Sequence, residues 1–147
     1  MREENEKPLV YACSGCSNVA QLANDLAVTM DRENLAEMSC IAGVGGNIKS
    51  LVRLAKSGRT IIALDGCPLN CVKACLKNHY IYPDYHFELT TMMGLKKTKG
   101  EKCNSIDAYN TMKMIYNRIT KEKIKRQNTQ KIPTVASVEP ILGRRPQ

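Results

Sequence analysis

Short apolar segments alternate with amphipathic segments along most of this chain. Runs of Val, Leu and Ile, bounded by polar or small residues, are typical of buried strands. Between them, apolar residues recur at i, i+3 and i+4, which is typical of helices with one buried face. The pattern predicts strands over residues 8–13, 36–43, 60–66 and 85–91, and helices over 17–30, 48–57, 67–78 and 105–125.

Each predicted helix has a recognisable start, end or inner face. Ser17 is the expected N-cap of the first helix, Gly58 follows the end of the second, and Pro68 fits the first position of the third. The expected inward-facing residues of the first helix are Val19, Leu22, Ala23, Leu26, Ala27 and Met30; of the second, Ile48, Leu51, Val52 and Ala55; and of the long last helix, Ile106, Tyr109, Met112, Tyr116 and Ile119.

Strands that alternate with helices imply right-handed βαβ units and a parallel sheet. The sequence therefore predicts an α/β fold: a three-layer sandwich with a small, mostly parallel sheet of about four strands, similar to Rossmann-like and flavodoxin-like folds. We expect a flexible N-terminus over 1–7, one α/β domain over 8–126, and a basic, proline-containing C-terminal tail over 127–147.

The net charge of +8 is unevenly distributed. Residues 118–147 carry eight lysines and arginines against two glutamates, a net charge of +6, which leaves +2 for everything before them. The basicity is therefore predicted to belong to the tail rather than to a folded face. No aromatic residues or nucleic-acid motif accompany these charges, so the sequence argues against nucleic acid as a partner.

The seven cysteines change the picture most. The chain begins without a signal-like apolar run and contains no stretch of membrane-spanning length, so we expect a cytoplasmic protein without a membrane partner. Thiols stay reduced in the cytosol, which favours metal or thiol chemistry over structural disulfides.

Five cysteines are predicted to meet at the carboxyl edge of the sheet, where parallel α/β folds bind ligands. Cys13 ends the first strand and Cys16 lies in the loop after it. Cys40 is expected late in the second strand, while Cys67 follows the third and opens the helix that carries Cys71.

Zinc is the ion that this thiol pattern favours. In the C-x-x-C of Cys13 and Cys16, Gly15 is expected to permit a tight turn. Cys67 and Cys71 are four residues apart, a spacing that lets side chains on a helix converge, and a helix start would stabilise a thiolate at Cys67. Cys75 would lie about 12 Å from Cys67 along that helix and is expected to pack as an apolar residue. Cys103 is expected to be an incidental thiol.

Other interpretations stay open or are excluded. Asp65 could orient a ligand, bind the metal, or stabilise a turn. The Cys13/Cys16 pair could serve thiol–disulfide exchange, and an iron–sulfur cluster would also accept four thiolates. A phosphatase-like cysteine loop is excluded because Val19 stands where the arginine is needed. "AGVGGN" lacks the residues of a nucleotide-binding loop, and His79 and His86 lie outside any ligand spacing.

Three stretches together resemble one family. "YACSGCSNVAQLANDLA", the lone cysteine of "SCIAGVGGN", and "IIALDGCPLNCVKACL" are similar, in this order, to the DGC family, small cysteine-rich proteins named after the Asp-Gly-Cys found here at 65–67. The resemblance spans residues 8–110. It implies a zinc-binding α/β domain with Cys13, Cys16, Cys67 and Cys71 as ligands and Cys40 as a fifth family-like cysteine.

The sequence thus predicts a zinc-binding protein that handles or senses metal or sulfur, with a protein or a small molecule as its partner. It determines neither an enzymatic activity nor an oligomeric state.

Overall fold

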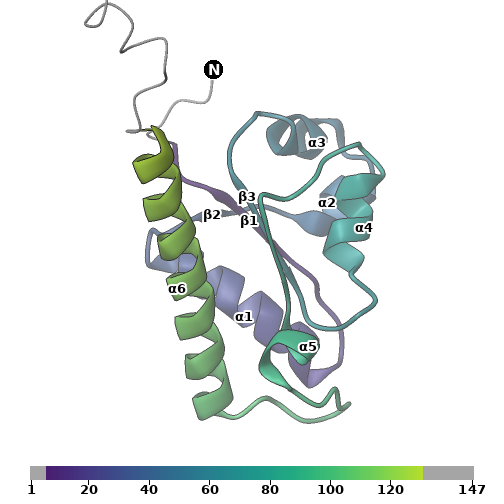
Figure 1. Ribbon diagram of the computed structural model, residues 1–147. Coiled ribbons are helices and arrows are strands. Elements are labelled where there is room, and N and C mark those ends of the chain that lie inside the picture. Colours follow the sequence, from purple (N-terminus) through teal and green to yellow (C-terminus); the bar gives the residue numbers. More distant parts are fainter. Residues whose placement is uncertain (1–5, 131–147) are drawn as a thin grey trace, which may run out of the picture. The chain divides into compact units, whose positions relative to one another are not determined.

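A computed structural model describes residues 6–130 of the chain. The chain divides into two compact units, residues 1–112 and 113–147. The sheet and the cysteines all belong to the first unit (Figure 1). Residues 131–147, most of the predicted tail, and residues 1–5 of the predicted flexible N-terminus lie outside the described part.

The first unit is built on a four-stranded, entirely parallel sheet with strand order β2-β1-β3-β4. Every residue of β1 and β3 is buried, because helices cover both faces of these central strands. The strands are β1 (Leu9–Ala12), β2 (Glu37–Met38), β3 (Ile61–Asp65) and β4 (Tyr85–Glu88).

Helices lie on both faces of this sheet, which confirms the predicted α/β sandwich. Figure 1 shows α1 (Asn18–Arg32) on one face, with α2 (Ile41–Gly45), α3 (Lys49–Ala55) and α4 (Cys71–Lys77) on the other. Ser17 is the N-cap of α1, as predicted, and its hydroxyl accepts a hydrogen bond from the Ala20 N–H. All six predicted inward residues of α1 are buried. Two more helices follow β4, namely α5 (Leu89–Met93) and α6 (Ser105–Gln130).

The strand order places a topological switch point between β1 and β3. The chain leaves β1 towards β2 on one side and returns to β3 on the other. Parallel sheets bind ligands beside the carboxyl ends of the strands at such a point. Cys13 directly follows β1 and Cys67 closely follows β3, so the topology brings this part of the predicted site to the switch point.

The predicted second strand is wrong over most of its length. Only Glu37 and Met38 pair with β1, and the chain then turns into the short helix α2 with Cys40 as its N-cap. The apolar run that resembled a strand instead packs against neighbouring helices. An added Cβ at Gly43 would stand only 2.0 Å from Leu51, because α2 and α3 approach so closely.

The predicted fourth strand also ends early. The Glu88 carboxylate accepts hydrogen bonds from the Thr90 and Thr91 N–H groups, both at 3.0 Å, and so begins α5 where the prediction continued the strand. This side-chain cap offers the backbone an alternative to the sheet.

Two predicted inner faces are partly wrong. Ile48 is 51% exposed, and Ile106, Tyr109 and Tyr116 of α6 are all more than half exposed. Ile119 is buried, as predicted, but the other buried residues of α6 are Thr111 and Ile115. This face has i, i+4 spacing and includes a threonine, which makes it weak in an apolar pattern. The last helix continues to Gln130, beyond the predicted boundary at 126.

Among the helices of residues 6–130, none combines the length and the apolar character needed to cross a membrane.

Gly66 marks a close approach between the loop after β3 and helix α1. A Cβ at this position would lie 2.6 Å from the Val19 carbonyl atoms and 2.7 Å from the Ala20 nitrogen, all backbone atoms that cannot move independently. We therefore expect Gly66→Ala to lower the free energy of unfolding by about 1–3 kcal/mol, measured by urea denaturation.

Gly15→Ala is the matched control. Its Cβ would meet only the Ala20 Cβ at an ordinary 3.8 Å, and the φ of Gly15 lies outside the left-handed region, so the turn does not need the glycine that the sequence seemed to require. An equal loss of stability in both variants would contradict the close packing at Gly66.

Candidate functional site

Cys13 joins the ends of the two central strands. Its N–H donates to the Leu64 carbonyl at 3.0 Å, and its Sγ accepts a hydrogen bond from the Gly66 N–H at 3.2 Å. The residue is only 8% exposed. The thiol therefore lies at the switch point, inside the protein rather than on its surface.

Burial is the main reason why the pKa of Cys13 rises from 9.0 to about 11. The hydrogen bond from Gly66 opposes this rise, whereas the negative charges of Asp65, Cys71 and Cys67 add to it. These groups therefore lie within electrostatic range of the Cys13 thiol. Three of the five predicted ligands, Cys13, Cys67 and Cys71, are thus coupled electrostatically.

Asp65 organises the polypeptide around this thiol group. It ends β3, is 1% exposed, and its carboxylate accepts hydrogen bonds from the N–H groups of Val72 at 2.8 Å and Lys73 at 3.3 Å. His86 Nε2 of the neighbouring strand β4 lies 2.9 Å from the same carboxylate. Of the three roles that the sequence left open, the stabilisation of local structure is the one that these contacts perform.

The start of α4 differs from the prediction. Cys67 and Pro68 lie in a turn, and the helix begins at Cys71, after Asn70 in a left-handed conformation with φ 53°. The Asn70 side chain makes no capping hydrogen bond. Instead, the carboxylate of Asp65, several residues earlier in the sequence, accepts hydrogen bonds from the N–H groups of Val72 and Lys73 in the first turn of the helix. Cys67 and Cys71 therefore do not share a helix face, and Cys67 does not occupy a helix start.

Lys97 is a neighbour of Cys67 that the sequence did not identify. Its Nζ lies 3.3 Å from the Cys67 Sγ, across a separation of thirty residues. Similarly, His86 contacts Asp65 across twenty-one residues. Neither contact has a local sequence signal, since each depends on how two distant segments pack.

The remaining cysteines have different surroundings. Cys16 and Cys40 are exposed, and neither is among the groups whose charges act on Cys13. Cys75 is partly buried beside α2: a Cβ added at Gly45 would stand 2.9 Å from its Sγ. Cys103 is also partly buried, and burial raises the pKa values of both thiols.

The donors suit a thiophilic ion in kind, but they do not form a coordination shell. Across residues 6–130, no three His, Cys, Asp or Glu side chains are arranged so that they could hold one metal ion. All seven cysteines are free thiols. Cys16 and Cys71 are exposed whereas Cys13 is buried, so a metal bound by all three would have to draw these side chains together.

Asp65 should contribute strongly to stability. Asp65→Ala removes the acceptor of two helix N–H groups and the partner of His86 in a buried setting, so we expect a loss of about 3 kcal/mol or more in urea unfolding. Asp31 provides the control: it is exposed and accepts one backbone hydrogen bond, from Met38 at 2.9 Å, so Asp31→Ala should cost at most about 1 kcal/mol. Equal losses would show that the Asp65 contacts contribute little.

The raised pKa of Cys13 predicts how the metal-free chain reacts with iodoacetamide. Only the thiolate is alkylated, so Cys13 should react more slowly than exposed Cys16 at pH 8, and its rate should rise about tenfold per pH unit until about pH 11. Mass spectrometry of the labelled peptides measures both rates. A Cys13 rate that levels off below pH 9 would contradict the effect of burial.

The same shift makes the fold sensitive to alkali. The unfolded chain releases the Cys13 thiol proton near pH 9, whereas the folded chain retains it until about pH 11. The contribution of the neutral Cys13 thiol to the free energy of unfolding is therefore complete below pH 9. Up to about 3 kcal/mol of it is lost between pH 9 and 11.

Comparison with known proteins places this chain in a family. Residues 9–115, which include all seven cysteines, match the family model described as the DGC domain. The chain is 66% identical over 101 residues to the "Anaerobic and virulence modulator AnvM" of Pseudomonas aeruginosa, a match that covers 69% of this chain and 76% of that protein. No solved structure matches the chain. The family model covers most of the described residues and includes the Asp65–Cys67 motif, so this chain belongs to the DGC domain family.

Proposed function

We propose that this protein binds a thiophilic metal ion, zinc in the first place, at the switch point and uses the site for sensing. One observation carries the proposal: the buried thiol of Cys13 lies within electrostatic range of Cys67 and Cys71, although these residues are far from it in sequence. Cys16 would supply the fourth thiolate, since it stands three residues after Cys13 on the exposed side of the loop.

The chain's own groups favour a cation at this position. A buried neutral thiol beside two further cysteines and the charge of Asp65 is a site where positive charge would relieve repulsion and release the thiol proton. A bound zinc ion would supply charge neutralisation and a fixed tetrahedral arrangement of thiolates. Asp65 would not need to bind it, because its carboxylate already serves α4 and His86.

A sensing role follows from the openness of the site. Structural zinc sites are closed and saturated, whereas Cys16 and Cys71 are exposed and Cys40 is a spare thiol at the same edge of the sheet. Gain or loss of a ligand there would alter the loops after β1 and β3. The similar protein of Pseudomonas aeruginosa is named as a modulator, which agrees with a regulatory role. In this proposal, the protein senses metal or thiol oxidation in the reducing cytoplasm.

Zinc binding is tested with protein purified without oxygen. We expect about one zinc ion per chain, and we expect Cys67→Ser and Cys71→Ser each to weaken zinc affinity by at least about 100-fold, since each removes a ligand rather than an outer partner. Competition with a chromophoric chelator measures the affinity. Cys103→Ser is the matched control and should retain the affinity of the unaltered chain.

Alkylation before and after chelation separates the alternatives. Protection of Cys13, Cys67 and Cys71 that chelation abolishes supports a bound metal, and iron with sulfide in place of zinc identifies an iron–sulfur cluster. A reversible Cys13–Cys16 disulfide without any metal identifies the thiol–disulfide alternative instead. Full alkylation that chelation leaves unchanged, in protein without metal, would overturn the metal site.

A further inference from the structure

Positive charge is also concentrated around helix α3, at the opposite end of β3 from Cys13 and Cys67. Between Met38 and Pro83 the chain carries six lysines and arginines against the buried Asp65, and this stretch is flanked by two acidic residues, Glu37, which pairs with Arg59, and Asp84. The C-terminal segment keeps its net charge of +6, but the first unit also contains a basic region of its own. The near-neutral sum before residue 118 hides a separation of positive and negative charge within the first unit.

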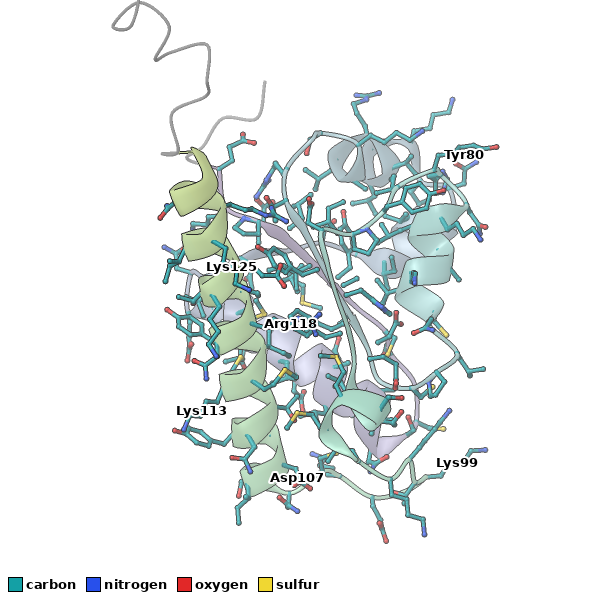
Figure 2. All side chains as sticks on the ribbon, viewed as in Figure 1. Tyr80, Lys99, Asp107, Lys113, Arg118 and Lys125 are labelled. Atoms are coloured by element: carbon teal, nitrogen blue, oxygen red, sulfur yellow. The ribbon has the colours of Figure 1, made fainter. Side chains whose placement is uncertain are left out.

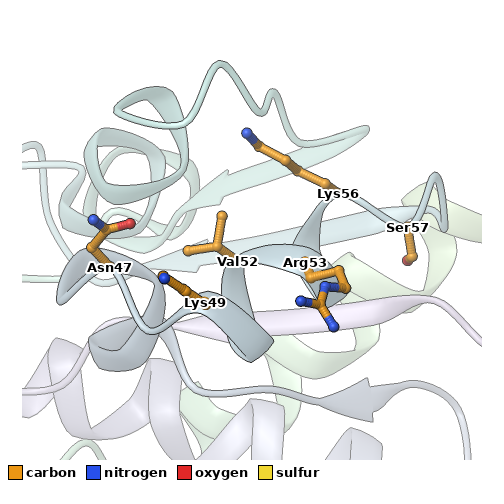
Figure 3. Close-up of a pocket in the computed structure, with 6 residues that line it drawn as sticks. All are labelled: Asn47, Lys49, Val52, Arg53, Lys56 and Ser57. Atoms are coloured by element: carbon orange, nitrogen blue, oxygen red, sulfur yellow. The ribbon is translucent and has the colours of Figure 1, made fainter.

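Three of these cations line one depression on α3. It has a volume of about 550 Å³ and is lined by Asn47, Lys49, Val52, Arg53, Lys56 and Ser57 (Figure 3). Lys49 and Arg53 are four residues apart on α3 and Lys56 is its C-cap residue, so the three cations follow one another over about 10 Å along the helix. Within residues 6–130, none of the three has an acidic partner, whereas Arg59 is paired with Glu37 at 2.7 Å.

A second depression adjoins the first at Lys56. It measures about 420 Å³, and its lining includes Lys56, Arg59, Ile61, Tyr80, Tyr82 and Asp84, whose carboxylate accepts a hydrogen bond from the Ile61 N–H at 2.9 Å. Ile61 is the first residue of β3, while the cysteine site follows its last residue, so about 13 Å of strand separates the two regions. In Figure 2, Tyr80 lies at one end of the first unit and Lys99 at the other. Lys99 forms a β-bridge with Ser17, the residue after Cys16.

The backbone conformation of Tyr80 destabilises the fold, and burial of its side chain does not offset this. Its φ of 58° is left-handed, and it occupies the turn that ends α4, where its N–H donates to Lys77 and the next N–H, of Ile81, donates to Leu76. Glycine normally takes such a position, because a side chain there costs about 1–2 kcal/mol. The ring recovers nothing by burial, since Tyr80 is 85% exposed. Tyr82 beside it is 66% exposed.

We propose that this basic–aromatic surface, formed by Lys49, Val52, Arg53, Lys56, Tyr80 and Tyr82, binds an acidic segment of a partner protein. Charge complementarity identifies the chemistry of the occupant: a row of carboxylates would pair with the three cations, which have no acidic partner within residues 6–130. Val52 and the two tyrosines supply the apolar and aromatic contacts that dominate protein interfaces. Nucleic acid fits less well, because its binding depends on many phosphate contacts and this surface offers three cations.

The surface is tested on the full chain with short random peptides displayed on phage. We expect the enriched peptides to be acidic with at least one apolar residue. For a labelled synthetic copy of an enriched peptide, Arg53→Glu should weaken binding at least about tenfold in fluorescence anisotropy. Lys121→Glu, the matched control, makes the same change of charge at an exposed position of α6 and should leave binding unchanged.

Tyr80→Gly separates a binding role from a structural one. Glycine relieves the left-handed strain, so the melting temperature should stay the same or rise, while peptide binding weakens at least about fivefold. The proposal is overturned if no acidic peptide is enriched, if Lys121→Glu weakens binding as much as Arg53→Glu, or if Tyr80→Gly leaves the affinity unchanged. Tighter binding of an oligonucleotide of equal charge to the same residues would overturn it in favour of nucleic acid.

Discussion

The carboxylate of Asp65 is the contact on which the candidate site depends. It ends the central strand β3, is almost completely buried, and binds two N–H groups of α4 together with the imidazole of His86 on β4. A buried carboxylate without partners would be very costly, so these three contacts have to form together. They determine where α4 begins, and with it the position of Cys71 and the course of the turn that carries Cys67.

The sheet separates two kinds of surface along its central strand. At the carboxyl end of β3, Cys13 and Cys67 follow the two strands of the switch point, and the charges of Cys67 and Cys71 act on the Cys13 thiol. At its amino end, Lys56 joins two depressions that also include cations of α3 and the exposed rings of Tyr80 and Tyr82. One end thus offers soft sulfur donors, and the other offers positive charge with aromatic contact area. A metal-responsive site and a protein-binding surface could act independently on such a scaffold, with the rigid strands β1 and β3 between them.

The positions of Cys13 and Cys67 in the fold were predictable, because the order of strands and helices around them can be read from local sequence patterns. Cys13 and Cys67 follow buried apolar strands, and parallel strands bring their carboxyl ends together. That Cys67 lies in a turn and not at a helix start was not predictable from spacing, because α4 begins only after the left-handed Asn70 and is capped by the carboxylate of Asp65. Cys40 was misplaced because an apolar run of this length suits a buried helix as well as a strand. Lys97 and His86 had no signal at all, since their partners lie far along the sequence.

The sequence by itself determined the α/β class, the parallel sheet, the Ser17 cap and the family, because periodicity, capping residues and a cysteine motif are local properties. Only the tertiary structure decided which thiols share an electrostatic environment, that Asp65 caps α4 and binds His86, and that positive charge gathers on α3 despite a near-neutral sum. These depend on distances between residues remote in sequence, and such distances are set by how helices pack on a sheet rather than by any residue's own preference.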